Sequence, residues 1–353
     1  MGRQSTTTRR LELDCLEHEN KLNIEQQVQL IRPFKKKDVK EALFGIHSSK
    51  SPRPDSFGAG FFKGLWEEIG DDISKAVLGF FQTGTLPKEM NETTISLIPK
   101  TDSPQNAGDF RPIACCNTIY KCISKMMCTR LSKVLPILIH ENQGAFIKKL
   151  RSLARNILIL QDLLKGYTRR NISARCIMKI DLSKAYDSVD WCFVDDLLKG
   201  LYFPSRSISW IQSCLHGASY SLILNGRIQG SFKGEKGLRQ GDPMSPLLFV
   251  LIIEYLTRLL IHKSKEKGFR FHPLCKSLGL VNLCFADDLI ILCRGNEKSV
   301  KESCQSNGMM NERLATSRRS ADHLYCTLWP KIGRLASRAD EVGLADPGRC
   351  MAG

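Results

Sequence analysis

Two adjacent aspartates, Asp287 and Asp288, stand between two short apolar runs, 281–286 and 289–293. The runs have the length and composition of buried strands, so the chain is expected to turn at the aspartates and to hold both carboxylates at the tip of a hairpin. Two like charges repel each other there, and a divalent cation such as Mg²⁺, which prefers carboxylate oxygens, would remove the conflict. Because Asp is also a common turn residue, the pair by itself fits either a metal site or a solvated turn.

A third aspartate, Asp181, follows the apolar run 176–180, which has the pattern of a strand. A carboxylate at the end of a strand is well placed to meet the tip of the hairpin across a sheet. The alternative is a helix cap, since Asp is favoured there and a helix-like segment follows. Asp187 and Asp190 fit solvated positions on a turn or helix better.

The segment 237–246 reads Gly-Leu-Arg-Gln-Gly-Asp-Pro-Met-Ser-Pro and precedes a long apolar run. Its two glycines allow the backbone to approach a ligand closely. Ser245 and Pro246 are typical of the N-cap and the first position of a helix. A plain loop-to-helix junction explains these two residues but not the Arg-Gln-Gly run before them.

Two cations of the first half, Lys100 and Arg111, each lie at the end of a polar loop. Two such charges near a cluster of carboxylates would suit a triphosphate substrate. Taken by themselves, they are better explained as a solvated surface pair.

The elements that must position these residues alternate between helical and strand patterns. Hydrophobic spacing predicts helices within 36–81, around a proline-rich loop at 50–56, and a strand at 93–98 followed by a second loop at 109–112. A basic helix is expected over about 118–135 and another helix over 154–164. Asn225-Gly226 between two strand patterns is a strong hairpin signal. The last predicted helix ends near Lys263.

Composition favours a nucleic-acid partner inside the cell. The 353 residues carry a formal net charge of +16, from 52 basic and 36 acidic residues, and such an excess suggests a polyanion. Fourteen cysteines without a repeated C-x-x-C and a polar N-terminus without a signal peptide favour a reducing intracellular compartment. The longest apolar stretch, 247–253, is well short of the ~20 residues that a membrane span needs, so no membrane association is expected.

Five motifs in fixed order resemble the reverse transcriptases of LINE-type (non-long-terminal-repeat) retrotransposons, and those of flowering plants look closest. The resemblance covers about residues 36–300. The motifs are Leu97–Lys100, Phe110–Ile113, Asp181–Trp191, Gly237–Pro246 and Phe285–Asp288. Each alone is weak, whereas the ordered set is specific.

The resemblance implies an RNA-directed DNA polymerase, a nucleotidyltransferase with an α+β right-hand fold that has fingers and palm. The 53 residues after Val300 are too few for a thumb, so the thumb is expected to be missing. It divides the chain into an unassigned N-terminal segment (1–35), a helical extension of the fingers (36–92), the reverse transcriptase domain (93–300) and a divergent, disordered tail (301–353). The implied partners are an RNA template, a DNA primer and deoxynucleoside triphosphates, and no membrane.

The resemblance also implies the role of each site residue. Asp181 and Asp287 would bridge two Mg²⁺ ions (Mn²⁺ is possible), with Asp288 as a more peripheral third ligand. Tyr186 would be an aromatic sugar gate that favours deoxynucleotides. The remaining roles are a contact of Gln240 and Gly241 with the incoming nucleotide and template, a triphosphate clamp of Arg111 and Lys100, and a template-facing basic helix from Thr118.

Departures from the family pattern leave alternatives open. Arg53 and Ser56 replace glycines of the first family loop, and the family's continuation after Val300 is not found. An inactive retrotransposon remnant that only binds nucleic acid is therefore the main alternative. An RNA-directed RNA polymerase is a third, although Tyr186 argues against it, as does Ala286 in place of the glycine usual before paired aspartates in those enzymes.

Overall fold

The computed structural model describes residues 14–17, 19–48, 57–147, 153–165, 167, 173–182, 185–286 and 288–314. Asp287, the proline-rich loop at 50–56 and the segment 315–353 lie outside the described residues. The helices are α1 (Asp14–Glu17), α2 (Ile24–Ile31), α3 (Lys36–Phe44), α4 (Ala59–Gly64), α5 (Trp66–Thr83), α6 (Lys88–Asn91), α7 (Thr118–Leu138), α8 (Leu153–Leu164), α9 (Ala185–Ser188), α10 (Trp191–Gly200), α11 (Ser205–His216), α12 (Ser245–Ser264) and α13 (Glu297–Leu314). The strands are β1 (Glu92–Pro99), β2 (Phe110–Cys116), β3 (Arg175–Asp181), β4 (Ser219–Leu224), β5 (Arg227–Lys233), β6 (Asn282–Phe285) and β7 (Asp288–Arg294).

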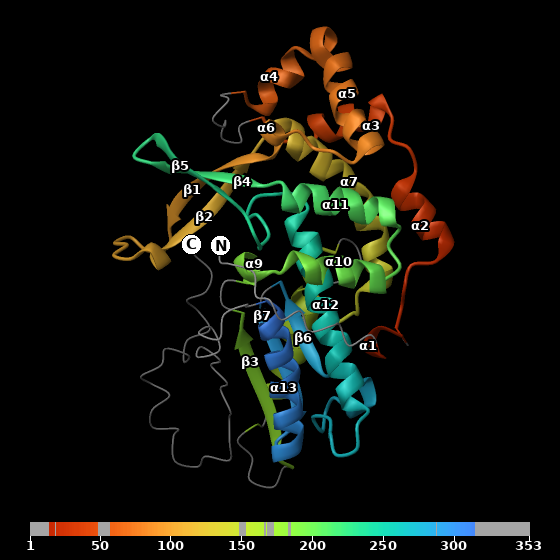
Figure 1. Cartoon of the computed structure of the whole chain (residues 1–353). Coiled ribbons are helices and arrows are strands. Elements are labelled where there is room, and N and C mark those ends of the chain that lie inside the picture. Colours follow the sequence, from red (N-terminus) through yellow and green to blue (C-terminus); the bar gives the residue numbers. More distant parts are fainter. Residues whose placement is uncertain are drawn as a thin grey trace.

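Two separate sheets organise the chain, which has the mixed α and β content expected from the sequence. A four-stranded sheet has the order β2-β1-β4-β5, and a three-stranded sheet has the order β3-β7-β6. In Figure 1 the four-stranded sheet lies in the upper half below α3 to α6, and the three-stranded sheet lies in the lower half beside α13. Helix α12 runs between the two halves (Figure 1).

The four-stranded sheet combines an antiparallel β1–β2 pair, a parallel β1–β4 pair and the β4–β5 hairpin. Asn225 and Gly226 both have positive φ, 51° and 74°. Positive φ at both central residues is typical of the two-residue hairpin turn that the Asn-Gly signal predicts. The loop predicted at 109–112 is wrong beyond Asp109, because β2 begins at Phe110 and contains Arg111 and Pro112. Proline is tolerated there because β2 is an edge strand.

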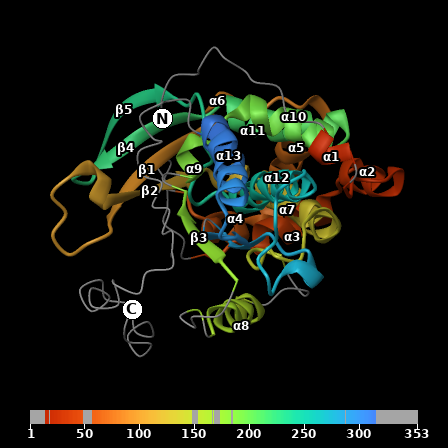
Figure 2. The ribbon, with the colours of Figure 1, turned by 90° about the horizontal axis from the view of Figure 1, so that it is seen from below.

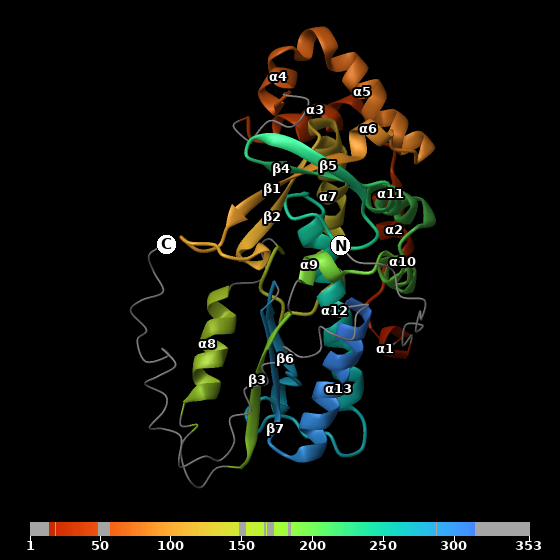
Figure 3. The same ribbon diagram turned by 60° about the vertical axis from the view of Figure 1, so that its left-hand side comes forward.

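The three-stranded sheet is covered on both faces, as Figure 3 shows with α8 on one side and α13 on the other. Alternation along the strands explains this. Met178 and Ile291 are paired in register and belong to the main core. Ile177 and Leu292 form the neighbouring pair and pack instead against apolar residues of α8.

Helix α12 is the centre of the main core and lies beside α7 when the molecule is viewed from below (Figure 2). Every residue from Leu247 to Leu260 is buried, and a helix that is apolar all round is a core helix or a membrane span. By length and composition α12 is the one helix among the described residues that could cross a membrane, but 83% of its most apolar window is buried inside the protein.

A buried charge cluster joins α12 to two earlier segments of the chain. Arg258 Nε donates to Glu254 Oε1 at 2.9 Å, and the side chains are 0% and 1% exposed. Arg258 also donates to the carbonyl oxygens of Asn20 and Leu138. Burial alone would lower the pKa of His140, but its hydrogen bond to Glu254 and the charges of Glu254 and Glu19 raise that pKa above its ordinary value.

Both ends of the described chain contain helices that the sequence reading missed. Helix α2 begins with a capping box formed by Asn23 and Gln26, and α2 packs against α7 and α11. Helix α13 crosses the boundary predicted at residue 300, so the prediction of a disordered tail is wrong for residues 301–314. Its buried Ser303 and Ser306 bond back to carbonyl oxygens four residues earlier, which lets polar residues occupy an inner face.

We expect Arg258→Ala to lower the free energy of unfolding by about 3–5 kcal/mol, because it removes the guanidinium from a buried ion pair and leaves Glu254 with His140 as its remaining partner. The matched control is Lys263→Ala near the end of the same helix, which removes a partly exposed ion pair with Glu266 and should cost under about 1 kcal/mol. Urea denaturation of both variants measures the difference. Equal losses would contradict a structural role for the buried cluster.

Candidate active site

Asp181 and Asp288, two of the predicted carboxylate positions, come together where β7, the second strand of the β6–β7 hairpin, pairs with β3. Strands β6 and β7 are antiparallel, and Phe285 is the register partner of Asp288. Two residues therefore connect the two strands. One of these, Ala286, has a φ of 55°, a left-handed conformation that is uncommon for a residue with a side chain. On the other side of β7, Asp181 at the end of β3 is the register partner of Asp288.

Directly opposed residues of antiparallel strands have their Cβ atoms only about 4.5–5.5 Å apart, and opposed like charges are destabilising. The register therefore places two carboxylate-bearing residues where they repel each other. The structure describes the backbone of Asp181, and Asp287 lies outside the described residues. Among the side chains that are described, no three His, Cys, Asp or Glu gather as a metal site, so the predicted set of three carboxylates remains a prediction.

Lys179 is a cation at this end of the sheet that the sequence reading did not single out. Its Nζ lies 3.3 Å from Asp288 Oδ1, and both side chains are more than 60% exposed. An exposed pair of this kind contributes little to stability because water screens it. Its position two residues before Asp181 on one strand is the signal that could have revealed it, since such residues share a face of the sheet.

The loop that carries Gln240 and Gly241 is held by buried charges on both of its sides. Arg239, 3% exposed, donates to Asn91 Oδ1 and to the carbonyl oxygen of Cys214. Asp242, also 3% exposed, accepts from the hydroxyl groups of Tyr120 and Ser124 on α7. Burial raises the pKa of Tyr120 well above its ordinary value, so this phenol remains a donor.

Asp242 also determines where α12 begins. Its Oδ1 accepts from the backbone N–H of Met244 at 3.0 Å, and Met244 is the N-cap of a helix that starts at Ser245. The prediction of Ser245 as the N-cap and Pro246 as the first position is therefore displaced by one residue. The carboxylate of Asp242, rather than a serine hydroxyl, satisfies a free N–H at this helix end.

The glycines of this loop allow two chain segments to approach each other. Gly241 has a φ of 113°, and a Cβ built on it would lie 2.8 Å from the carbonyl oxygen of Ala114 in β2. Gly237 has a φ of 94°, and its Cβ would lie 3.0 Å from the carbonyl oxygen of Asp187. In this structure the close approach predicted for a ligand is therefore an approach to β2 and α9.

Tyr186 lies on α9, directly beside this loop. Its ring stacks on that of Phe249, with centroids 4.7 Å apart and an interplanar angle of 18°. The backbone N–H of Leu238 donates to the carbonyl oxygen of Tyr186 at 2.7 Å. The ring is half-buried, so one part of it is fixed by the core and another part is accessible.

Arg111 and Lys100 both belong to the β1–β2 region, but only Arg111 is on a strand. Arg111 is exposed on β2, three residues before Ala114, whose N–H donates to the carbonyl oxygen of Gln240 at 2.6 Å. The structure therefore links Arg111 to the Gln240 loop through β2. Lys100 lies in the β1–β2 connection, where its Nζ donates to the carbonyl oxygen of Gly108 at 2.9 Å.

Helix α7 differs from the expected template-facing basic helix. Lys125 donates to the carbonyl oxygen of Gly45, next to α3, and Arg130 donates to that of Leu30 in α2. Arg130 also stacks on the ring of Phe34. These two cations hold the N-terminal helices, so the interpretation as template contacts is wrong for them.

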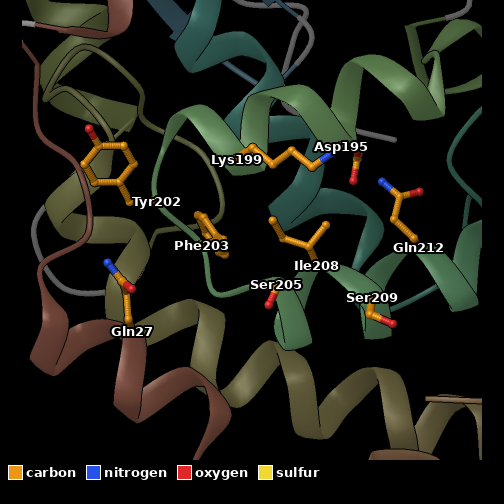
Figure 4. Close-up of a pocket in the computed structure, with 9 residues that line it drawn as sticks. All are labelled: Gln27, Asp195, Lys199, Tyr202, Phe203, Ser205, Ile208, Ser209 and Gln212. Atoms are coloured by element: carbon orange, nitrogen blue, oxygen red, sulfur yellow. Dashed lines mark hydrogen bonds and ion pairs between the residues drawn. The ribbon is translucent and has the colours of Figure 1, made fainter. Parts of the chain in front are cut away.

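A surface cavity of 610 Å³ lies between α2, α10 and α11 (Figure 4). It is lined by Gln27, Asp195, Lys199, Tyr202, Phe203, Ser205, Ile208, Ser209 and Gln212. None of these residues belongs to the strands of the hairpin or to the Gln240 loop. We therefore do not assign the active site to this cavity.

Residues 98–317 match the reverse transcriptase (RNA-dependent DNA polymerase) family. The chain belongs to this family. The match begins near the end of β1, includes strands β2 to β7 and extends beyond the end of α13.

Similar proteins come from retrotransposable elements, which confirms the resemblance to LINE-type reverse transcriptases. The chain is 26% identical over 266 residues to the transposon TX1 uncharacterized 149 kDa protein of Xenopus laevis, covering 75% of the chain and 20% of that protein. It is 28% identical over 247 residues to the Pol polyprotein of the type-2 retrotransposable element R2DM of Drosophila melanogaster, covering 70% of the chain and 22% of that protein. The chain thus spans about a fifth of the length of these relatives.

A short match also points to a plant protein. The chain is 48% identical over 46 residues to the uncharacterized mitochondrial protein AtMg01250 of Arabidopsis thaliana, covering 13% of the chain. A match of this length is too short to carry an argument about origin. The plant affinity of this reverse transcriptase domain stays a prediction.

The most consequential residues that the sequence reading missed are the buried polar ones around the motifs of this reverse transcriptase domain. Arg239 and Asp242 stand on either side of the Gln240-Gly241 pair, and each bonds to partners more than a hundred residues earlier in the chain. The sequence analysis included both in the motif at 237–246 but gave neither of them a role. The signal that could have revealed them is their place between glycines in a short loop, where the close approach of chains excludes water.

We expect Gly241→Ala to lower the free energy of unfolding by about 1–3 kcal/mol, because alanine is strained at this φ and its Cβ would strike the backbone of β2. Gly79→Ala in α5 is the control, since nothing lies within 4 Å of a Cβ at that position and alanine favours a helix. In thermal unfolding, the midpoint temperature should fall for Gly241→Ala and should rise or stay unchanged for Gly79→Ala. A neutral Gly241→Ala would contradict the close contact between the loop and β2.

Proposed function

We propose that this chain is the fingers and palm of an RNA-directed DNA polymerase, which adds deoxynucleotides to the 3′-hydroxyl of a DNA primer on an RNA template. The four-stranded sheet with its helices would be the fingers, and the three-stranded sheet with α12 the palm. The observation that supports this most directly is the register that pairs Asp181 with Asp288 at the end of the three-stranded sheet.

A divalent metal site at the hairpin is supported by the type and register of its residues. Asp288 is exposed and its recorded ion pair is the weak one to Lys179, and carboxylate oxygens are the ligands that Mg²⁺ prefers. Asp181 and Asp287 would hold two Mg²⁺ ions, with Asp288 at the periphery. When bound, such ions supply activation of the primer hydroxyl and neutralisation of the triphosphate and leaving pyrophosphate.

The remaining residues would bind and orient the substrates. Arg111, with Lys100 as a weaker partner, would clamp the triphosphate through charge-assisted hydrogen bonds. Gln240 and Gly241 would contact the incoming nucleotide and the template. Positioning of this kind carries most of the catalysis in phosphoryl transfer, because there is little covalent chemistry for the protein to do.

Primer extension on an RNA template with Mg²⁺ tests the proposal. We expect Asp181→Asn and Asp287→Asn each to reduce incorporation by about a thousandfold, since each removes a metal ligand worth several kcal/mol in the transition state. Asp162→Asn, which alters an exposed ion pair on α8, is the charge-matched control and should retain full activity. Extension that persists in Asp287→Asn would refute the mechanism.

The net charge of +16 also supports a second function, binding of nucleic acid without catalysis. RNA-binding and primer-extension assays on the same protein distinguish this binding function from the polymerase function. Binding of RNA that weakens steeply with salt, together with no incorporation by the unsubstituted chain, would establish the binding function and reject the polymerase.

We expect the unsubstituted chain to use deoxynucleotides in preference to ribonucleotides, because the ring of Tyr186 would crowd a 2′-hydroxyl. Tyr186→Val should narrow this preference by about tenfold or more while dNTP incorporation is largely retained, which corresponds to about 1.4 kcal/mol of steric discrimination. Single-nucleotide incorporation with dNTPs and NTPs measures the ratio. Equal use of NTPs by the unsubstituted chain would indicate an RNA polymerase instead.

A further inference from the structure

The outer strand of the carboxylate hairpin, β6, is bordered by a loop from the end of α7. The N–H of Cys284 donates to the carbonyl oxygen of Asn142 at 3.0 Å, and the N–H of Gly144 donates to the carbonyl oxygen of Cys284 at 2.9 Å. Gln143 and Cys284 form a parallel bridge. This loop therefore extends the three-stranded sheet by one short contact at its β6 edge.

Asn156 on α8 joins this loop to β6 with a single amide group. Its Nδ2 donates to the carbonyl oxygen of Asn142 at 3.0 Å and to that of Cys284 at 3.2 Å. The side chain is buried, so water cannot easily replace either bond. Cys284 lies three residues before Asp287, on the strand that leads into the turn.

The same network continues across β6 to the central helix. Asn142 Nδ2 donates to Asn282 Oδ1 at 2.7 Å, and Asn282 Nδ2 donates to Thr257 Oγ1 at 2.9 Å. Asn142, Asn282 and Thr257 are all buried. The outer strand of the hairpin is thus held between α8 and α12 by hydrogen bonds that run from Asn156 to the backbone of Asn142 and Cys284 and from the side chain of Asn142 through Asn282 to Thr257.

Gly144 makes room for the Asn156 amide. A Cβ built on Gly144 would lie 3.1 Å from Asn156 Nδ2 and 3.5 Å from Phe285 Cδ2. The loop, the amide and the residue that opens the turn are therefore in close contact. A shift of any one of them must displace the others, because a packed interior transmits such movements.

We propose that Asn156 is a positioning residue for the carboxylate hairpin. Its amide fixes the position of β6, and β6 in turn fixes the position of the turn before Asp288. The proposal rests on the proposed polymerase function and deepens it. Asn156 acts through the backbone of Cys284 and does not itself contact substrate. Displacement of a catalytic group by about 1 Å can reduce a rate by about a hundredfold, so a residue of this kind affects the chemical step.

The first test is steady-state primer extension by Asn156→Ala. We expect kcat to fall by about ten- to a hundredfold, the KM for dNTP to change by less than about threefold, and the Mg²⁺ concentration for half-maximal rate to rise. The control is Gln161→Ala at an exposed position of the same helix, with unchanged constants. Unchanged kcat and Mg²⁺ dependence in Asn156→Ala would overturn the proposal.

The second test is the pH profile of Asn156→Asp, which keeps the shape of the side chain. An ionised carboxylate would face two carbonyl oxygens, whereas a protonated one can donate to one of them, and burial raises the pKa of a carboxyl group above its usual value near 4. The activity of Asn156→Asp relative to that of the unsubstituted chain at the same pH should therefore rise as the pH falls. A ratio that does not vary with pH, beside a low kcat, would indicate a different role and overturn the proposal.

Hydrogen exchange provides a readout that does not depend on activity. The amides of Gly144 and Cys284 and those of β7 should exchange about tenfold faster or more in Asn156→Ala, while α10 and α11 keep their protection. If the unsubstituted chain incorporates no nucleotide but this pattern is observed, the polymerase function fails and the positioning role stands. Unchanged exchange at the hairpin would overturn the positioning role whatever the activity.

Discussion

Repulsion between two aspartates opposed on neighbouring strands is the constraint on which the rest of the structure depends. Asp181 and Asp288 are register partners at the end of the three-stranded sheet, where opposed like charges are destabilising. The strands are held in this register because most of their apolar residues are buried, on one face in the main core and on the other against α8. Ile180 and Leu289, the next pair, belong to the main core, and a slip of one residue would turn such side chains toward the opposite face.

Residues that would contact substrate are held in place by buried polar neighbours, in both halves of the site. Gln240 and Gly241 stand between Arg239 and Asp242, which bond to α6, α7 and α11. The turn of the hairpin follows Cys284, whose carbonyl oxygen accepts from Asn156. Buried polar groups with satisfied hydrogen bonds specify one arrangement because an alternative arrangement would leave them unpaired. The exposed ends of strands and loops acquire defined positions in this way.

Prediction from sequence succeeded where a local pattern has one physical meaning. Short apolar runs of strand length predicted the hairpin strands, and Asn225-Gly226 predicted the turn between β4 and β5. It failed where the local pattern was ambiguous. Pro112 suggested a loop although an edge strand tolerates proline, and the serines of α13 concealed a helix whose hydroxyl groups are satisfied within the helix itself. Arg130 looked like a template contact because its sequence neighbours do not include Leu30, its actual partner.

The sequence by itself determined the local pieces: an aspartate at the end of one strand, an aspartate pair between two others, and a glycine-containing loop before an apolar helix. Apolar periodicity and turn residues report burial and chain reversal, which are local properties. Only the tertiary structure decided three contacts. Asp288 lies opposite Asp181, Gly241 packs on Ala114, and Asn156 donates a hydrogen bond to the carbonyl oxygen of Cys284. Each of these contacts joins residues more than a hundred positions apart, and packing of the core selects such partners because no short stretch of sequence carries their register.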